Sequence, residues 1–143
     1  MRIEKVDLWS PGFDLRCITT NGTINKQGAC VMGKGCAREA NMRFGLGKEL
    51  GDRIKGVGNV VQLFPDISPG VNLATFPVKH NWWEKADLAL IGRSALQLQI
   101  LIDDWGFTKV ALPMPGCGNG GLNWKDVAGV IGFLDDRVIV VHQ

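Results

Sequence analysis

The sequence has few of the side chains that hold metal ions. Its 143 residues include only two histidines and four cysteines. No two of the cysteines have the CxxC spacing of zinc ligands, so we expect no bound metal. Isolated cysteines are typical of proteins in the reducing cytosol, which predicts a cytoplasmic location.

Long apolar runs and a strong net charge are also missing. No stretch is long enough to cross a membrane, and no signal-peptide pattern is present. The net charge of +2 is too small to indicate nucleic-acid binding by itself. The length predicts one domain over residues 1–143, and we expect a monomer without membrane contact.

Glycine, in contrast, is abundant. Glycine accounts for 19 of the 143 residues, well above its usual share of about 7% of a protein. Three of them lie in residues 28–37 and four in residues 113–124. The excess therefore indicates two ligand-binding loops.

The later loop stands between a predicted strand and a predicted helix. An apolar run at residues 110–112 precedes it, and residues 125–134 follow with apolar side chains at helical spacing. Glycines permit positive φ and let a ligand approach the backbone closely. The start of a helix adds unpaired N–H groups and a partial positive charge, and this combination binds phosphate.

The remaining periodicity predicts strands and helices in partial alternation. Strands are expected at residues 2–9, 15–20, 59–64, 71–76, 109–112 and 137–142, and helices at residues 34–44, 49–54, 86–105 and 125–134. The helix at 86–105 is the clearest, because its apolar residues repeat at intervals of three and four, at Leu88, Ile91, Ala95, Leu98 and Ile102. This order indicates an α/β fold, a three-layer α/β/α sandwich around a sheet of about six strands.

Ligands of such sheets bind beyond the carboxyl ends of the strands. Both glycine-rich loops follow predicted strands. We therefore expect the two loops to face each other and to hold a diphosphate between them.

Two common nucleotide motifs match only in part. Residues 28–34 fit the first seven positions of the P-loop pattern GxxxxGK[ST], but Gly35 replaces the hydroxyl residue that would hold magnesium. Residues 116–121 fit GxGxxG, but only one helix and one strand follow, whereas a dinucleotide fold places this motif early. These departures argue against a nucleoside triphosphatase and against a dinucleotide-binding enzyme.

Four segments, in this order and spacing, resemble a known family. They are residues 19–22, 31–37, 76–79 and 115–124, of which the VMGKG and GCGNGGL stretches are the most specific. Together they resemble the macrodomains, and in particular the DNA ADP-ribosyl glycohydrolase antitoxins and the terminal ADP-ribose glycohydrolases. The resemblance covers nearly the whole chain. It implies a mixed six-stranded sheet with ADP-ribose in the crevice at its edge, as ligand or product, and no cofactor.

The resemblance also implies roles for individual residues. Asp7, with Leu8 beside it, matches the aspartate that contacts adenine, and Asn21 matches the asparagine near the distal ribose. The first loop, whose backbone faces the phosphates, matches Val31, Met32, Gly33, Lys34, Gly35 and Cys36. The second loop matches Pro115, Gly116, Cys117, Gly118, Asn119, Gly120, Gly121 and Leu122.

Lys79 matches the lysine that attacks the anomeric carbon of the ribose in this branch. A lysine amine forms a Schiff base with an opened ribose only in its neutral form. Partial burial or a neighbouring cation favours that form, and His80 and the pair Trp82 and Trp83 are candidates for such surroundings. The terminal glycohydrolases have an aspartate where this chain has Gly120, so the residue that transfers the proton has no match here.

Several functions stay open at this stage. The first is a hydrolase that removes ADP-ribose from DNA, RNA or protein with Lys79 as nucleophile. The others are an ADP-ribose 1″-phosphate phosphatase, a non-catalytic ADP-ribose-binding module and, outside the family, a protein that binds another nucleotide. Structural roles are also open: Lys79 as a solvated residue at a strand end, Asp7 as a turn residue, and Trp82 and Trp83 either as a cover of the core or as a stacking surface for a nucleobase.

Overall fold

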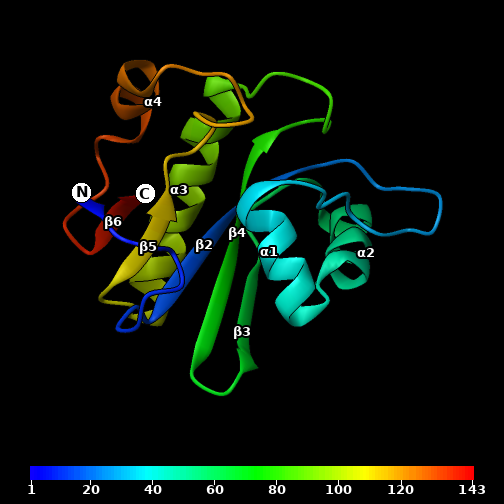
Figure 1. The fold of residues 1–143 in the computed structure, drawn as a ribbon, viewed down its shortest axis with the longest axis horizontal. Coiled ribbons are helices and arrows are strands. Elements are labelled where there is room, and N and C mark those ends of the chain that lie inside the picture. Colours follow the sequence, from blue (N-terminus) through cyan, green and yellow to red (C-terminus); the bar gives the residue numbers. More distant parts are fainter.

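The computed structural model describes residues 1–143 and contains one six-stranded sheet with helices on both faces (Figure 1). The strands are β1 (Arg2–Lys5), β2 (Leu15–Asn21), β3 (Leu63–Ser68), β4 (Val71–Lys79), β5 (Val110–Pro113) and β6 (Val138–His142). The helices are α1 (Gly35–Phe44), α2 (Gly47–Val57), α3 (Leu88–Trp105) and α4 (Trp124–Ile131). None of the four combines the length and the apolar composition needed to span a membrane.

The sheet is mixed, as expected. Its strand order is β1-β6-β5-β2-β4-β3, and every neighbouring pair is parallel except β3 and β4. The adjacent central strands β2 and β5 lead into α1 and α4, which cover opposite faces of the sheet. In such sheets a crevice opens where the connections that follow two adjacent strands run to opposite faces of the sheet.

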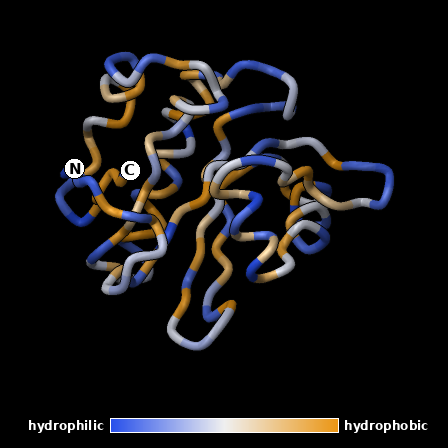
Figure 2. Tube along the Cα trace, in the orientation of Figure 1, coloured by the Kyte–Doolittle hydropathy of each residue, from blue (hydrophilic) through white to orange (hydrophobic).

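Two cores arise because successive residues of a strand point to opposite faces. In β2, Cys17 belongs to the core beneath α3 and α4, and Ile18 to the core beneath α1 and α2. The same alternation places Val140 in the first core and Val141 in the second. Hydrophobic residues accordingly mark the central strands in Figure 2, whereas the outer tip of the loop between β2 and α1 is hydrophilic. The three-layer sandwich predicted from the sequence is confirmed.

One predicted strand was placed wrongly. We expected a strand at residues 59–64, but β3 runs from Leu63 to Ser68. It includes Pro65 because β3 is an edge strand, where a missing N–H is tolerated. At Asp66 the backbone has a φ of 52°, and the register with β4 shifts between Phe64 and Ser68. The first strand is also shorter than predicted, since the chain leaves the sheet after Lys5.

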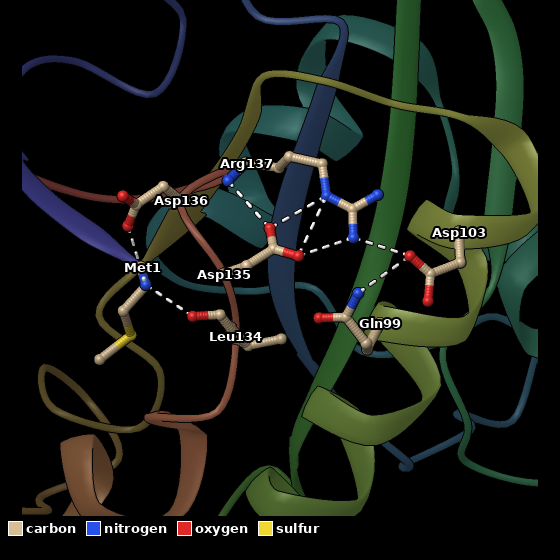
Figure 3. A network of polar contacts seen from close by, with 7 residues as sticks. All are labelled: Met1, Gln99, Asp103, Leu134, Asp135, Asp136 and Arg137. Carbon is tan, nitrogen blue, oxygen red and sulfur yellow. Dashed lines mark hydrogen bonds and ion pairs between the residues drawn. The ribbon is translucent and has the colours of Figure 1, made fainter.

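Polar contacts join Met1 to the turn between α4 and β6 (Figure 3). The Met1 amino group donates to the Leu134 carbonyl at 2.6 Å. Nearby, the guanidinium of Arg137 contacts both Asp135 and Asp103 at 2.7 Å. The hydrogen bonds that Arg137 donates to Asp135 hold the pKa of Asp135 down to about 2. The network fixes the turn between α4 and β6.

Candidate functional site

A cavity of about 460 Å³ lies beyond the carboxyl ends of β2, β4 and β5. Its volume falls in the range of pockets that enclose small organic ligands. It is lined by Thr19, Thr20, Asn21, Val31, Met32, Gly33, Lys34, Gly35, Cys36, Ala37, Val78, Lys79, Trp82, Pro113, Met114, Gly116, Gly118, Asn119 and Gly120. This set contains two lysines and no aspartate, glutamate or histidine, so the charged groups of the wall are all cationic.

The first glycine-rich loop reaches the cavity at the start of α1. Gly35 has a φ of 59°, a conformation that glycine adopts without strain. The residue at the N-cap of α1, Lys34, makes no capping hydrogen bond through its side chain, and the first turn of α1 has no acidic residue. The N–H groups of Gly33, Lys34 and Gly35 donate no hydrogen bond within the protein. Free amides and an uncompensated helix dipole therefore face the cavity, an arrangement suited to an anion.

The second glycine-rich loop supplies a second set of free amides. Its shape is held by hydrogen bonds from Leu122 N to Gly116 O at 2.9 Å and from Ala86 N to Gly120 O at 3.0 Å. The N–H groups of Gly118, Asn119 and Gly120 donate no hydrogen bond within the protein. We expected the start of α4 to contribute as well. That helix does not line the cavity, and the Asn123 side chain caps it by accepting from Lys125 N at 3.0 Å.

The two loops meet across the cavity. The side-chain Nδ2 atom of Asn119 lies 3.6 Å from the position that a Cβ atom would occupy on Gly35. The two loops, each with free backbone N–H groups, therefore line one cavity and approach each other closely enough for a single ligand to contact both. Backbone nests of this kind bind phosphate groups.

Lys79 ends β4 and lies at the edge of this space. Its Nζ atom donates to the Asn119 carbonyl at 3.2 Å and to the Trp82 carbonyl at 3.4 Å. The amine is therefore held between the second loop and the turn that follows β4. His80, the next residue, does not line the cavity; its ring contacts Asp87 at 2.7 Å, and this hydrogen bond lowers the pKa of Asp87.

No side chain can replace Gly120 without a rearrangement. A Cβ atom on Gly120 would lie 2.5 Å from the Gly116 carbonyl oxygen and 2.8 Å from the Ala86 Cβ atom. The backbone of the loop itself occupies the space, and it cannot yield as a flexible side chain would. An aspartate is therefore excluded at the position where the resemblance placed one in the related branch.

A second cavity, of about 180 Å³, adjoins the first. Cys36 and Pro113 line both. The other residues of its wall are Val6, Asp7, Leu8, Trp9, Glu39, Val141, His142 and Gln143. Apolar and polar side chains thus share the wall of this cavity, a mixture that suits a heteroaromatic ring.

Asp7 has structural contacts in this second cavity. One carboxylate oxygen accepts from Trp9 N at 2.7 Å, and the other accepts from the Gln143 amide at 3.0 Å. Asp7 therefore turns the chain, as the simplest interpretation of the sequence held, and it also lines a cavity. Leu8 is buried, and its carbonyl accepts from Arg16 Nε at 3.0 Å.

Most of the residues named from the sequence come together at the two cavities. The exceptions lie in the second loop and line neither cavity: Pro115, Cys117, Gly121 and Leu122. They support the loop instead. For example, the Cys117 thiol donates to the Pro115 carbonyl at 3.6 Å.

Asn21 lines the larger cavity, but its side chain is largely occupied. Its amide donates to the Val31 carbonyl at 3.0 Å and accepts from Thr23 N at 2.9 Å. The residue therefore ties the end of β2 to the first loop.

Sequence reasoning missed much of the second cavity. Trp9 and Glu39, joined by a hydrogen bond of 2.9 Å, line it together with His142 and Gln143 from the end of the chain. No local pattern marks these residues, since they come from the segment after β1, from α1 and from the end of β6, and only the tertiary fold brings them together.

Cys36 stands between the two cavities. Burial raises the pKa of its thiol, although hydrogen bonds with Thr19 act in the opposite direction. The thiol lies 3.3 Å from the Thr19 hydroxyl. These surroundings do not activate the thiol, which favours a packing role for Cys36 beside a ligand.

The same fold occurs in solved structures. The macrodomain of Mycobacterium tuberculosis DarG superposes with a TM-score of 0.79 and 25% identity, over 98% of this chain and 95% of that one. The chain has the macrodomain fold. The Thermus aquaticus DarG macrodomain also superposes on it, with a TM-score of 0.77 and 21% identity, over 99% and 97% of the two chains. A third structure, Thermosipho africanus DarTG in complex with ADP-ribose, gives a TM-score of 0.73 and 20% identity, over 90% of this chain and 38% of that one.

Sequence comparison gives a shorter match. The macrodomain is 38% identical over 56 residues to the DNA ADP-ribosyl glycohydrolases of Mycobacterium bovis and Mycobacterium tuberculosis. That stretch is 39% of this chain and only 16% of the length of either relative. No family model matches the sequence.

Proposed function

We propose that this macrodomain binds ADP-ribose and hydrolyses the bond between ADP-ribose and a DNA acceptor. The diphosphate lies between the two glycine-rich loops, where free amides face each other. Adenine occupies the smaller cavity beside Asp7 and Leu8, and the distal ribose lies near Asn21 and Lys79. The observation that carries this proposal is the pair of opposed amide sets, with no carboxylate in the cavity wall to repel a diphosphate.

Lys79 is the proposed nucleophile. Its neutral amine attacks the anomeric carbon C1″, the bond from C1″ to the acceptor breaks, and the acceptor leaves with the electron pair and takes up a proton. The C1″–O4″ bond of the ribose then breaks, and O4″ takes up the remaining proton of the nitrogen, which leaves a Schiff base between Lys79 and the opened ribose. Water adds to C1″ of the Schiff base, the C1″–N bond breaks, and ADP-ribose is released with the amine restored. The position of Nζ at the edge of the cavity, next to the second loop, supports this role.

One observation favours a second candidate function, a module that binds ADP-ribose without chemistry. The cavity wall contains no aspartate, glutamate or histidine that could transfer a proton to the acceptor. In addition, the backbone around Gly120 leaves no room for the aspartate of the related branch.

The comparisons bear on the acceptor only through the names of relatives. Two relatives are named DNA ADP-ribosyl glycohydrolases, which supports a DNA acceptor for this chain. The Thermosipho africanus structure is a complex with ADP-ribose, which supports ADP-ribose as the ligand. We further propose a monomer that needs neither metal nor cofactor. No group of three or more His, Cys, Asp or Glu side chains is placed to hold a metal ion.

An activity panel tests the proposal. Wild type and Lys79→Ala are each given ADP-ribosylated single-stranded DNA, ADP-ribosylated protein and ADP-ribose 1″-phosphate, with and without EDTA. Binding of free ADP-ribose is measured by calorimetry, and Lys125→Ala, an exposed lysine outside both cavities, is the control.

The proposal predicts EDTA-resistant release of ADP-ribose from DNA by wild type and Lys125→Ala, and none by Lys79→Ala. Binding without release by wild type would establish the second candidate. Phosphate release from the 1″-phosphate alone would identify a phosphatase, and an absence of ADP-ribose binding would refute the proposal as a whole.

A further inference from the structure

Two adjacent tryptophans stand exposed at the mouth of the larger cavity. Trp82 and Trp83 lie on the turn between β4 and α3, and 50% and 63% of their surfaces are exposed. They were candidates for a cover of the core, but they do not belong to either core. Their ring centroids are 5.9 Å apart and their planes meet at 89°. The two rings thus meet edge to face and form a corner, and half or more of each residue remains exposed.

The turn that carries the tryptophans is fixed by hydrogen bonds. Trp82 N donates to the Thr23 hydroxyl at 2.9 Å, which joins the turn to the segment after β2. Within the turn, the Asn81 amide donates to the Glu84 carboxylate at 2.8 Å, and Glu84 N donates to the Asn81 carbonyl at 3.1 Å. The rings are therefore presented by an ordered backbone, which reduces the entropy lost when a ligand binds them.

The corner adjoins the place where chemistry is proposed. Trp82 lines the larger cavity, and its carbonyl accepts from Lys79 Nζ at 3.4 Å. Under the proposed function, the bond that breaks lies at Lys79, so the acceptor leaves the cavity beside the two rings. An acceptor bound there contacts tryptophan before it reaches solvent.

Cationic side chains flank the same opening. Lys34 lines the cavity from the first loop, and Lys85 lies against the second loop, with its side chain 3.8 Å from the position of a Cβ atom on Gly121. Of the acidic residues on the turn, Glu84 is hydrogen-bonded to Asn81 and Asp87 to His80. Aromatic faces next to a few cations are the combination that binds single-stranded nucleic acid, where bases stack and phosphates pair with lysine.

We propose that Trp82 and Trp83 form a stacking platform for the bases of a single-stranded nucleic acid that carries the ADP-ribose. The proposal rests on the proposed function and adds the part of the substrate that is recognised outside the ADP-ribose cavities. Bases in a duplex do not expose their faces, so the platform selects single strands. A stacked base contributes a factor of roughly 5 to 150 in binding.

The test compares substitutions of Trp83, which lines neither cavity, with a matched control. Trp83→Ala removes one face of the corner, Trp83→Phe keeps an aromatic face, and Trp83→Leu keeps only apolar bulk. The control is Trp105→Ala, because Trp105 is 58% exposed and lies at the other end of α3. Trp82→Ala is measured as a second disruption of the platform.

Three readouts are taken for each variant. They are the affinity for free ADP-ribose, the affinity for a labelled unmodified oligonucleotide as single strand and as duplex, and kcat/KM for ADP-ribosylated oligonucleotide and ADP-ribosylated peptide. Trp83→Ala and Trp83→Leu are expected to lose roughly 5- to 150-fold in single-strand affinity and in kcat/KM for the oligonucleotide. Trp83→Phe is expected to keep most of both, and free ADP-ribose and the peptide should be unaffected.

Other outcomes would overturn the platform. An equal loss on oligonucleotide, peptide and free ADP-ribose would make Trp83 a structural residue, and a larger loss on the peptide would indicate a protein acceptor. If Trp83→Ala and Trp82→Ala both bound the oligonucleotide as tightly as wild type, the platform would be refuted and the proposed function would still stand. Wild type that binds no ADP-ribose would instead refute the proposed function, whatever the oligonucleotide data show.

Discussion

Lys79 and Asn119 are hydrogen-bonded, with Nζ 3.2 Å from the Asn119 carbonyl oxygen. One residue ends β4, the other lies at the tip of the second glycine-rich loop, and 40 positions separate them in the sequence. The contact joins the candidate nucleophile to the loop that is proposed to hold the diphosphate. Binding of the phosphates and positioning of the amine are therefore linked through a single loop.

Replacement of Lys79 should separate binding from chemistry. Lys79→Ala and Lys79→Arg both lack a primary amine, so we expect kcat to fall by roughly three orders of magnitude or more. Lys79→Arg keeps the positive charge and should bind ADP-ribose about as tightly as wild type. Reduction of wild type with cyanoborohydride during turnover should trap an ADP-ribose adduct on Lys79, identified by mass spectrometry. Turnover by Lys79→Arg would remove the amine from the mechanism.

Gly120 should not tolerate a side chain. Gly120→Ala and Gly120→Asp place a Cβ atom 2.5 Å from the Gly116 carbonyl oxygen, so we expect a loss of about 1–3 kcal/mol in the free energy of unfolding, together with weaker ADP-ribose binding. Gly129→Ala is the matched control, because Gly129 lies in α4 with nothing within 4 Å of a Cβ atom. That change should stabilise the protein by about 0.5–1 kcal/mol. Gly120→Ala with wild-type stability and affinity would show that the crowding is easily relieved.

Cys36 should report on occupancy of the site. Burial raises the pKa of this thiol, so its alkylation should be slow at pH 7 and should accelerate only above the usual thiol range near pH 8.5. Because Cys36 lines both cavities, ADP-ribose should slow the reaction further. Cys117 lines neither cavity and should change less. Peptide mass spectrometry measures both sites in one sample, and equal protection of the two cysteines would argue against a ligand beside Cys36.

The Asp135–Arg137 contact should make stability depend on acid pH. The pKa of Asp135 is lowered to about 2 in the folded protein, against an ordinary value of about 3.9, so the contact stabilises the fold fully above pH 4. The contribution is lost as the pH falls from about 4 to about 2. We expect Asp135→Asn to lower the melting temperature by about 1–4 °C at pH 7, since the residue is exposed, and by progressively less below pH 4.

The control for this titration is Asp104→Asn, a neighbouring exposed aspartate that makes no hydrogen bond or ion pair within the protein. It should melt like wild type across the same pH range. A difference between Asp135→Asn and wild type that stays constant down to pH 2 would contradict the lowered pKa.

The fold was predictable where periodicity and topology agree. The apolar repeat of α3 and the alternation in β2 and β6 follow from the burial of one helix face and of both strand faces. The position of β3 was not predictable in this way. Pro65 reads as the start of a turn, and only its place on an edge strand makes it compatible with the sheet.

The sequence predicted the two glycine-rich loops of the site, but it predicted few of the residues that line the smaller cavity. Glycine-rich turns after two strands predict amides at one edge of the sheet, and both loops do line one cavity. Glu39 and His142 of the smaller cavity carry no such signal, because only long-range contacts place them: the pairing of β1 with β6 for His142, and the hydrogen bond with Trp9 for Glu39 of α1. Crowding around Gly120 is likewise invisible in the sequence, since it depends on the path of the loop past Gly116 and Ala86.

A crystal structure of the protein with ADP-ribose tests the central claim most directly. We expect one diphosphate between the loops, with its oxygens within hydrogen-bond distance of the backbone amides of residues 33–35 and of residues 118–120. We expect the distal ribose to lie next to Lys79. A diphosphate that contacts only one of the two loops, or that lies outside the larger cavity, would contradict it.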